Sequence, residues 1–363
     1  MDKMISFLKK KIKNINQKFI YMSLLIFFLV FVRNILRNLK DSMIANQIGS
    51  ESISFIAIFL HIPISFLFLK FYYKISKTND LSKIFSKVLS IFLLIFIFFS
   101  FIFIPNKDFF LPSEGITKKL IISFPKFTWI IKILSKWPFA IFAVFAELWS
   151  VVICSTCYWQ LANKIMNKRE SSKYYIYLST FGQISLIFSP LVSFFFEKIS
   201  FNYIVKEDFF IYYISFICTF ISIISFFLNK KTEKKFTICE EKKFTSNNNE
   251  NYNFIKSIKY LISSKILTKL CIITFSYSAI MSWSDGIITC MTKKMYENIY
   301  SLYNYKSKLL FCIGFFTLIF SFFGNFLIKK KGWKFITLSI PIVILFTGTL
   351  FFIFSFLFEI FLL

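Results

Sequence analysis

The chain has 363 residues, of which 56% are hydrophobic and 21% aromatic, with 55 Phe among them. A soluble protein of this length could not bury so much apolar side chain, so the composition predicts a helical membrane protein. The formal charge of +26 comes from lysines in short clusters between apolar runs. This pattern is typical of residues that orient helices and meet anionic lipid headgroups, and it argues against nucleic-acid binding.

Nine apolar segments are long enough to cross a bilayer, which takes about 20 residues per helix. They are residues 19–40, 52–72, 85–105, 137–163, 175–197, 208–228, 266–288, 308–328 and 333–356. Lys and Arg gather in the N-terminal tail and in every second loop, which predicts a cytoplasmic N-terminus. The expected fold is an all-α, polytopic membrane protein with about nine transmembrane helices.

One polar stretch, KKTEKKFTICEEKKFTSNNNENYN at 230–253, resembles a linker and separates six spans from three. We therefore expect a six-helix bundle over residues 1–228, a cytoplasmic linker over 229–265 and a partial C-terminal bundle of three helices over 266–363. A division of this kind is typical of carriers built from two six-helix halves around a cavity at the membrane midplane.

The first apolar run, from Phe19 to Val32, is too short to cross a bilayer and leads into RNILRNLKDSMI. The helix must continue to about Lys40, which places Arg33, Arg37 and Lys40 near membrane depth on one helical face. Snorkelling at a helix end would explain such charges, and so would an aqueous cavity that receives a polyanion. We favour the cavity because positive charge at this end of the helix opposes the orientation rule.

Two carboxylates also fall at membrane depth. Glu147 lies near the middle of its span, and Asp285 lies in SYSAIMSWSDGIITC with Trp283 beside it. An ionised side chain there costs several kcal/mol unless it is paired or hydrated. A structural ion pair with the cations of the first span and a place in a binding site both satisfy that need, and we favour the binding site.

Other residues that often carry chemistry have plainer interpretations. His61, beside Pro63, is expected to be a hydrogen-bonded packing residue. Cys154 and Cys157 form a CxxC pattern with no His or second Cys pair nearby, so we expect buried small hydrophobic side chains and no metal site.

The chain contains, in this order, ILRNLKDSMI with IGSESISFI, FPKFTWIIKILSKWPFAIFAVFAELW, SVVICSTCYWQLANKI, FIKSIKYLISSK and TGTLFFIF. These stretches resemble the ATP/ADP translocases, the nucleotide transporters of obligate intracellular bacteria and plastids. The resemblance keeps order and spacing across residues 15–357, and AELW followed by YWQLAN is its most specific part. It implies a multi-pass carrier, similar in architecture to the two-bundle major facilitator fold, that imports host ATP in exchange for ADP.

The resemblance also implies which residues serve the nucleotide: Arg37, Lys40, Glu147 and, on the seventh span, Asp285. Three departures from the family pattern stand out. Ile288 and Thr289 replace a Trp-Lys pair after the acid of the seventh span, where Lys293 is the basic residue that remains, and Ala57 replaces a Lys on the second span. The family has twelve spans, so we expect the last three to be missing. We expect the chain alone to transport poorly unless a partner, either a separate polypeptide or a second copy, supplies them.

We therefore predict a carrier of ATP and ADP that contacts membrane lipids and has no cofactor, metal site or enzymatic activity. The expected substrate-binding residues are Arg33, Arg37, Lys40, Glu147, Asp285 and Lys293. A truncated remnant that does not transport, a structural membrane protein and a carrier of another nucleotide or NAD are the alternatives, and exchange is not separated from proton-coupled uptake. The A+T-rich codons behind the Phe, Ile, Lys and Asn content point to the inner membrane of an intracellular bacterium.

Overall fold

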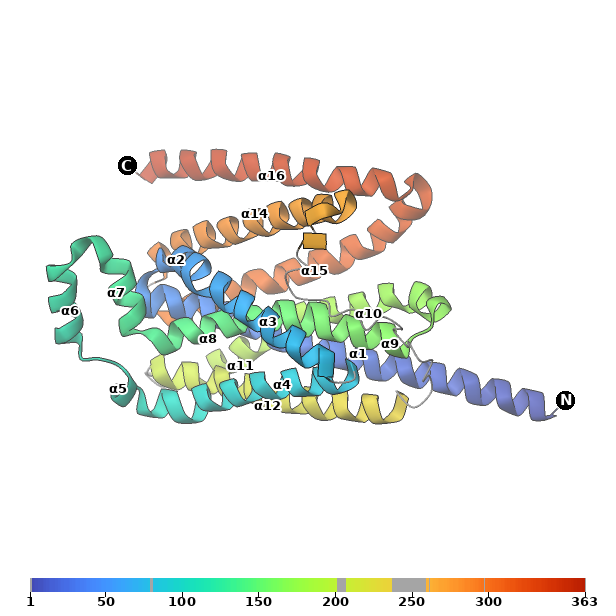
Figure 1. Cartoon of the computed structure of the whole chain (residues 1–363). Coiled ribbons are helices and arrows are strands. Elements are labelled where there is room, and N and C mark those ends of the chain that lie inside the picture. The colour runs from blue at the N-terminus through green and yellow to red at the C-terminus, as the bar shows by residue number, and fades with distance from the viewer. Residues whose placement is uncertain are drawn as a thin grey trace. The chain divides into compact units, whose positions relative to one another are not determined.

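The computed structural model describes residues 2–78, 81–200, 207–236, 259–260, 262–296 and 298–362, and these residues form helices and turns with no strand among them (Figure 1). The α-helices are α1 (Asp2–Ile44), α2 (Ser52–Ile56), α3 (Ile62–Thr78), α4 (Leu81–Ile97), α5 (Lys107–Phe110), α6 (Glu114–Ser123), α7 (Thr128–Ser135), α8 (Trp137–Leu148), α9 (Tyr158–Ile165), α10 (Lys168–Phe188), α11 (Leu191–Ser200), α12 (Glu207–Phe236), α14 (Lys265–Met295), α15 (Ile299–Lys331) and α16 (Trp333–Leu362). π-Helical segments are Ala45–Gly49, Ala57–His61, Phe98–Phe103 and Trp149–Cys157, and 3-10 turns are Ile104–Asn106 and Pro125–Phe127.

Several of these elements run together into longer membrane-crossing helices. Within the described part of the chain, 7 helical segments are long and apolar enough to span a bilayer. They are Gln17–Gly49, Ser52–Ser76, Lys83–Phe110, Trp137–Ile165, Lys173–Glu197, Glu207–Phe236 and Lys265–Met295. Each overlaps one of the first seven expected spans, and the chain is an all-α, multi-pass membrane protein. The last two expected spans fall on α15 and α16.

The first helix lies at the centre of the packing. Its side chains Leu25, Leu29, Leu36 and Leu39 are fully buried, and it packs against α8, α10 and α12 (Figure 1). It runs unbroken to Ile44, which confirms the expectation that the helix continues through its cluster of basic residues. The cations are therefore carried by a helix at the centre of the bundle.

Two aromatic side chains of the fourth span anchor it to α1. The Trp149 Nε1–H donates to the Leu29 carbonyl oxygen at 3.1 Å, and the Tyr158 hydroxyl donates to the Met22 carbonyl oxygen at 3.1 Å. Both rings are fully buried. Trp149 is the first residue of the π-helical segment Trp149–Cys157, and Tyr158 follows its last residue.

That π-helical segment is supported by its own hydroxyl groups. The Ser155 hydroxyl donates to the Ser150 carbonyl oxygen at 3.1 Å and the Thr156 hydroxyl to the Val151 carbonyl oxygen at 3.0 Å, both five residues earlier. The segment ends at Cys157, which is buried as a small hydrophobic side chain, as expected from the sequence.

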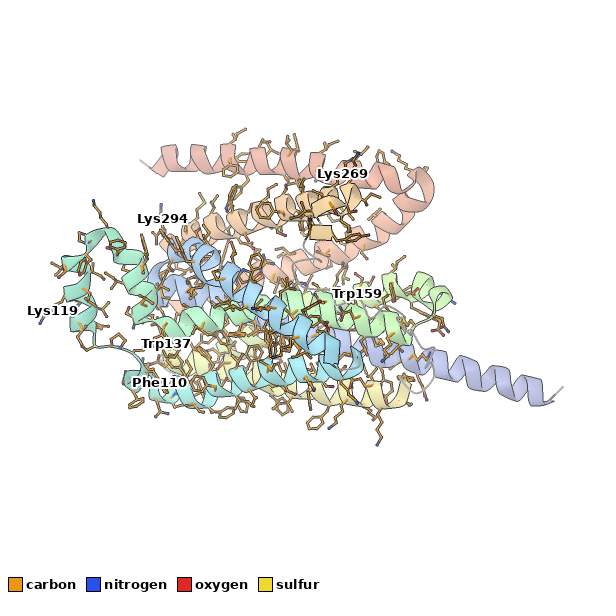
Figure 2. All side chains as sticks on the ribbon, viewed as in Figure 1. Phe110, Lys119, Trp137, Trp159, Lys269 and Lys294 are labelled. Carbon is orange, nitrogen blue, oxygen red and sulfur yellow. The ribbon has the colours of Figure 1, made fainter. Side chains whose placement is uncertain are left out.

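Large apolar side chains project outward along the helices (Figure 2). Examples on α12 and α14 are Phe220, Phe227, Ile272 and Phe275, each more than half exposed. In water such a surface would drive aggregation, whereas lipid tails solvate it. The exterior is that of a protein whose outer solvent is a bilayer.

The chain divides into two compact units, residues 1–312 and 313–363, with the boundary inside α15. In the second unit, α15 and α16 are joined at Gly332, whose φ of 81° lies in the left-handed region that favours glycine. Residues 237–258, most of the expected linker 229–265, lie outside the described part of the chain. The division into bundles over 1–228 and 266–363 stays a prediction.

Close approach of α1 and α10 at Gly182 generates a first test of this packing. A Cβ at Gly182 would lie 3.3 Å from Ile26 Cγ1 and 3.5 Å from Val30 Cγ2. We expect Gly182→Leu to lower the free energy of unfolding by about 1–3 kcal/mol through overpacking, seen as a lower unfolding midpoint in detergent. Gly115→Leu is the matched control, because no described atom lies within 4 Å of its Cβ position; equal midpoints for the two variants would contradict the close packing.

Candidate functional site

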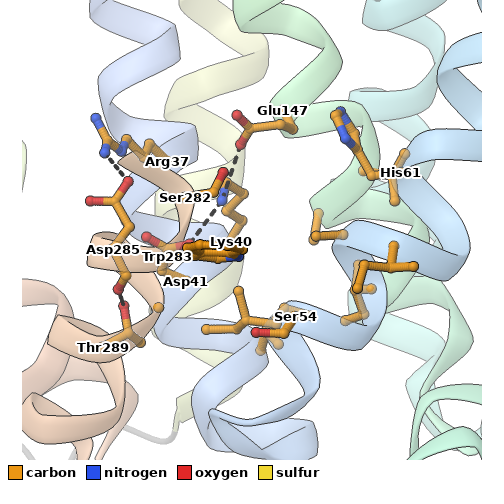
Figure 3. Close-up of a pocket in the computed structure, with 18 residues that line it drawn as sticks. Arg37, Lys40, Asp41, Ser54, His61, Glu147, Ser282, Trp283, Asp285 and Thr289 are labelled. Atoms are coloured by element: carbon orange, nitrogen blue, oxygen red, sulfur yellow. Dashed lines mark hydrogen bonds and ion pairs between the residues drawn. The ribbon is translucent and has the colours of Figure 1, made fainter. Parts of the chain in front are cut away.

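Four predicted site residues line a single cavity of about 200 Å³ inside the first compact unit. Arg37 and Lys40 come from α1, Glu147 from α8 and Asp285 from α14 (Figure 3). These residues lie far apart in the sequence, and the folding of three helices around one space brings them together. Four of the charged side chains that the sequence places at membrane depth therefore lie around the same cavity.

Two ion pairs connect α1 to its neighbours across this cavity. The Arg37 guanidinium pairs with the Asp285 carboxylate, and Lys40 Nζ lies 3.1 Å from Glu147 Oε2. The side chains of Arg37, Asp285 and Glu147 keep 38%, 42% and 45% of their surface exposed. These three groups can be reached from the cavity without unfolding the helices.

A more buried ionic layer lies behind these pairs. Asp41 Oδ1 is 2.8 Å from Lys40 Nζ, and Asp41 Oδ2 is 2.9 Å from Lys306 Nζ on α15. Lys306 Nζ also donates to the Thr289 hydroxyl oxygen at 2.8 Å. The side chains of Asp41 and Lys306 are only 10% and 11% exposed. Lys40 therefore belongs to both layers, because its ammonium contacts one exposed and one buried carboxylate.

The charges of the two layers balance. Three cations, Arg37, Lys40 and Lys306, face three carboxylates, Asp41, Glu147 and Asp285. An anionic ligand must therefore compete with carboxylates for the cations. The cavity of about 200 Å³ is also smaller than the roughly 300–1,000 Å³ of a usual ligand pocket, so a larger ligand requires the bridging pairs to separate.

Two other predicted residues do not line this cavity. Arg33 lies one helical turn before Arg37 on α1, and Lys293 lies about two turns beyond Asp285 on α14; both side chains are partly buried. A helical period of 3.6 residues places Arg33 on the same face as Arg37, but the cavity begins one turn later. The roles of Arg33 and Lys293 stay predictions.

Lys306 is the residue that the sequence analysis missed. The apolar run that predicts the eighth span starts at residue 308, whereas α15 already begins at Ile299, so Lys306 lies well inside the helix. Its ammonium reaches Thr289, the position at which the resembled family carries a Lys. A different helix thus brings positive charge to that place. The sequence held no clear signal for this contact, because Asp41 already follows three basic residues in RNILRNLKD.

His61 also differs from its expectation as a hydrogen-bonded packing residue. It lines the cavity, and its buried Nε2 has no hydrogen-bond partner within the described ranges. The π-helical segment Ala57–His61 supplies it, and a second π-helical segment, Ala45–Gly49, follows Asp41. Such segments are frequent at functional sites because they reorient side chains without ending the helix.

Comparisons with known proteins show the family to which the chain is related. The family model described as TLC ATP/ADP transporter matches residues 6–361. The proteins named ADP,ATP carrier protein 3 of Rickettsia conorii and of Rickettsia prowazekii are each 29% identical over 357 residues, covering 94% of this chain and 71% of the relative. ADP,ATP carrier protein 4 of Rickettsia typhi is 28% identical over 358 residues, covering 94% of this chain and 69% of the relative. No solved structure matches the chain.

The buried ionic layer yields a stability prediction. We expect Lys306→Met to remove one of the two cations that contact Asp41 and to leave the network with one excess negative charge. The cost should stay below the about 3–5 kcal/mol of a fully stranded buried charge, because Lys40 remains, and it is measured as a lower unfolding temperature of the purified protein. Adding Asp41→Asn should recover part of the loss, because the excess negative charge is then gone. Lys294→Met is the control, since it removes a Lys whose side chain is exposed on α14 (Figure 2). If Lys306→Met unfolds at the same temperature as Lys294→Met, the buried layer is not a stabilising element.

Proposed function

The chain belongs to the TLC ATP/ADP transporter family, and on that premise we propose that it carries nucleotides across a membrane, exchanging ATP for ADP. The phosphates bind the cations of the cavity, Arg37 and Lys40. Transport by this route changes no covalent bond of the nucleotide, so we propose a carrier and not an enzyme.

One observation supports this proposal most directly: a pair of cations on the central helix lines a cavity inside a membrane-protein bundle. Arg37 and Lys40 are three residues apart on α1, so they share a helical face at about 5–6 Å between their Cβ atoms. That spacing suits adjacent phosphate groups. Charge-assisted hydrogen bonds in a cavity of low dielectric would supply the affinity.

Carboxylates beside a polyanion site have a function in exchange. Glu147 and Asp285 occupy the cations through ion pairs, and nucleotide phosphates compete with them for the same groups. When a nucleotide leaves, the carboxylates neutralise Lys40 and Arg37 again. This replacement of one anion by another favours one-for-one exchange over leak.

Arg33 and Lys293 take secondary roles in this proposal. Arg33 continues the cationic face of α1 by one turn, and Lys293 continues α14 beyond Asp285. Both would attract the nucleotide toward the cavity without contacting it in the conformation described.

The proposed setting of the carrier rests on residue composition and on the distribution of charge. We place it in the inner membrane of an A+T-rich intracellular bacterium, with a cytoplasmic N-terminus and lysine clusters that meet anionic lipid headgroups. The match covers 71% of the first relatives named above. The remaining part of those relatives has no counterpart in the match. A segment corresponding to it would complete the wall of the cavity, whether it is joined to this sequence or supplied by a separate polypeptide.

Uptake by cells that express the chain tests the proposal. Cells loaded with labelled ATP should release the label faster when unlabelled ADP is added outside, and should take up labelled ATP by the same route. Uptake of ATP with no acceleration by ADP would contradict exchange. No uptake by cells in which the protein is inserted, even when the C-terminal part of a relative is co-expressed, would contradict transport.

Replacement of the cations should weaken binding. We expect Lys40→Ala and Arg37→Ala each to remove a contact worth about 1.5–3 kcal/mol, which weakens ATP binding by roughly ten- to a hundredfold while membrane insertion is kept. Lys40→Arg should be milder, because the charge is preserved. Titration calorimetry on purified protein measures the effect, with Lys294→Ala as the control; unchanged affinity in both cavity variants would rule out the phosphate site.

Loss of the countercharge should affect turnover more than binding. Glu147→Gln keeps the shape of the side chain but cannot neutralise Lys40, so we expect exchange in proteoliposomes to slow while the Kd for ATP stays close to that of the wild type. Glu114→Gln, at an exposed position on α6, is the matched control. A wild-type exchange rate in Glu147→Gln would show that Glu147 lines the cavity without a role in transport.

A further inference from the structure

The cavity has two chemically different sides. Arg37, Lys40, Asp41 and Asp285 form its ionic side on α1 and α14, and Glu147 of α8 reaches this side through its ion pair with Lys40. His61 and Ser54 lie across the space from the Arg37–Asp285 pair (Figure 3). An ionic site for a simple anion would not need the second side. The arrangement instead suits a ligand that is highly charged at one end and weakly polar at the other.

The side opposite the ion pair is mostly apolar. It is lined by Ile53 on α2, by Ala57 in the π-helical segment that follows, and by Ala143 and Val144 on α8. Two of these four residues are alanines, which take little space beside the backbone. A flat, apolar ligand group on this side would therefore meet small, apolar side chains.

His61 gives this apolar side a polar edge with unused hydrogen-bonding capacity. Its Nε2 is buried and has no hydrogen-bond partner among the residues with a described position, although such buried polar atoms are nearly always partnered in folded proteins. Imidazole nitrogens donate or accept according to tautomer. The Ser54 hydroxyl, which also lines the cavity, adds a second group able to donate or accept.

We propose that this side of the cavity is the nucleobase subsite and that His61 binds the edge of a purine ring. An adenine presents apolar faces, an acceptor at N7 and a donor at its exocyclic amine, so either tautomer of His61 has a partner on it. The inference rests on the proposed nucleotide transport and assigns the base to α2 and α8, opposite the cations that take the phosphates. Selectivity between nucleotides then depends on His61 and not on the ionic residues.

Tripolyphosphate separates the two halves of the site, because it carries the phosphates of ATP without the base. For the full chain in detergent, we expect His61→Ala to weaken ATP binding by about three- to tenfold, the effect of one lost hydrogen bond, and to leave tripolyphosphate binding unchanged. Lys40→Ala is the reference variant and should weaken both ligands. The subsite is ruled out if His61→Ala leaves ATP affinity intact or lowers the affinity for both ligands alike.

A measurement on the unmodified protein guards against a variant that fails to fold. His61 is the only His in the chain, so protein labelled at histidine and purified without a histidine tag gives one imidazole signal. We expect ATP to shift that signal strongly through the ring current of the base, and tripolyphosphate to shift it much less. Equal shifts from both ligands would overturn the base subsite and leave the phosphate site standing. Binding of neither ligand, in contrast, would overturn the nucleotide transport on which it rests.

Discussion

An ionised side chain inside an apolar helix bundle needs an opposite charge or water within reach. In this protein that requirement connects α1, α8, α14 and α15 at one place. The cations Arg37 and Lys40 of α1 pair with acids on α14 and α8, and the acid Asp41 of α1 pairs with Lys306 on α15. Apolar packing alone would let such helices slide or rotate, since lipid tails and leucines are equally apolar. The ion pairs define which faces meet, and the cavity is the space that remains between them.

Lys40 has a special place among these charges because its ammonium is shared. It contacts Asp41, which is buried, and Glu147, which reaches the cavity. Asp41 has a second cation in Lys306, so Lys40 can turn toward a ligand without stranding a buried carboxylate. The buried pair is then a fixed support, and the exposed pairs are the part of the network that a ligand can rearrange. This division assigns stability and binding to different carboxylates.

Depth along an apolar run is a property of the linear sequence, and for that reason the cavity residues Arg37, Lys40, Glu147 and Asp285 could be predicted from the sequence alone. The first seven spans could be predicted on the same basis. The pairing of Asp41 with Lys306, which are 265 residues apart, could not, because it depends on how α1 and α15 pack.

The role of His61 could not be predicted from the sequence either, because it also depends on how the helices pack. Its type and its neighbouring Pro63 suggested ordinary packing, and only the fold shows that its Nε2 has no partner among the described residues and that it faces a cavity opposite an ion pair. Arg33, in contrast, was predicted as a site residue but does not line the cavity. Periodicity places it on the cationic face, but periodicity carries no information on where along that face the neighbouring helices leave a space.

The π-helical segment Trp149–Cys157 changes the direction in which side chains before and after it point from the fourth span. Nine residues of α-helix make two and a half turns at 3.6 residues per turn, which would put Trp149 and Tyr158 on opposite sides. The wider π geometry takes roughly 4.5 residues per turn, so the same nine residues make two turns and both rings reach α1. A helical wheel drawn at 100° per residue would turn one of these buried rings toward lipid, and it would assign the wrong lipid-facing surface to the rest of the span beyond Cys157.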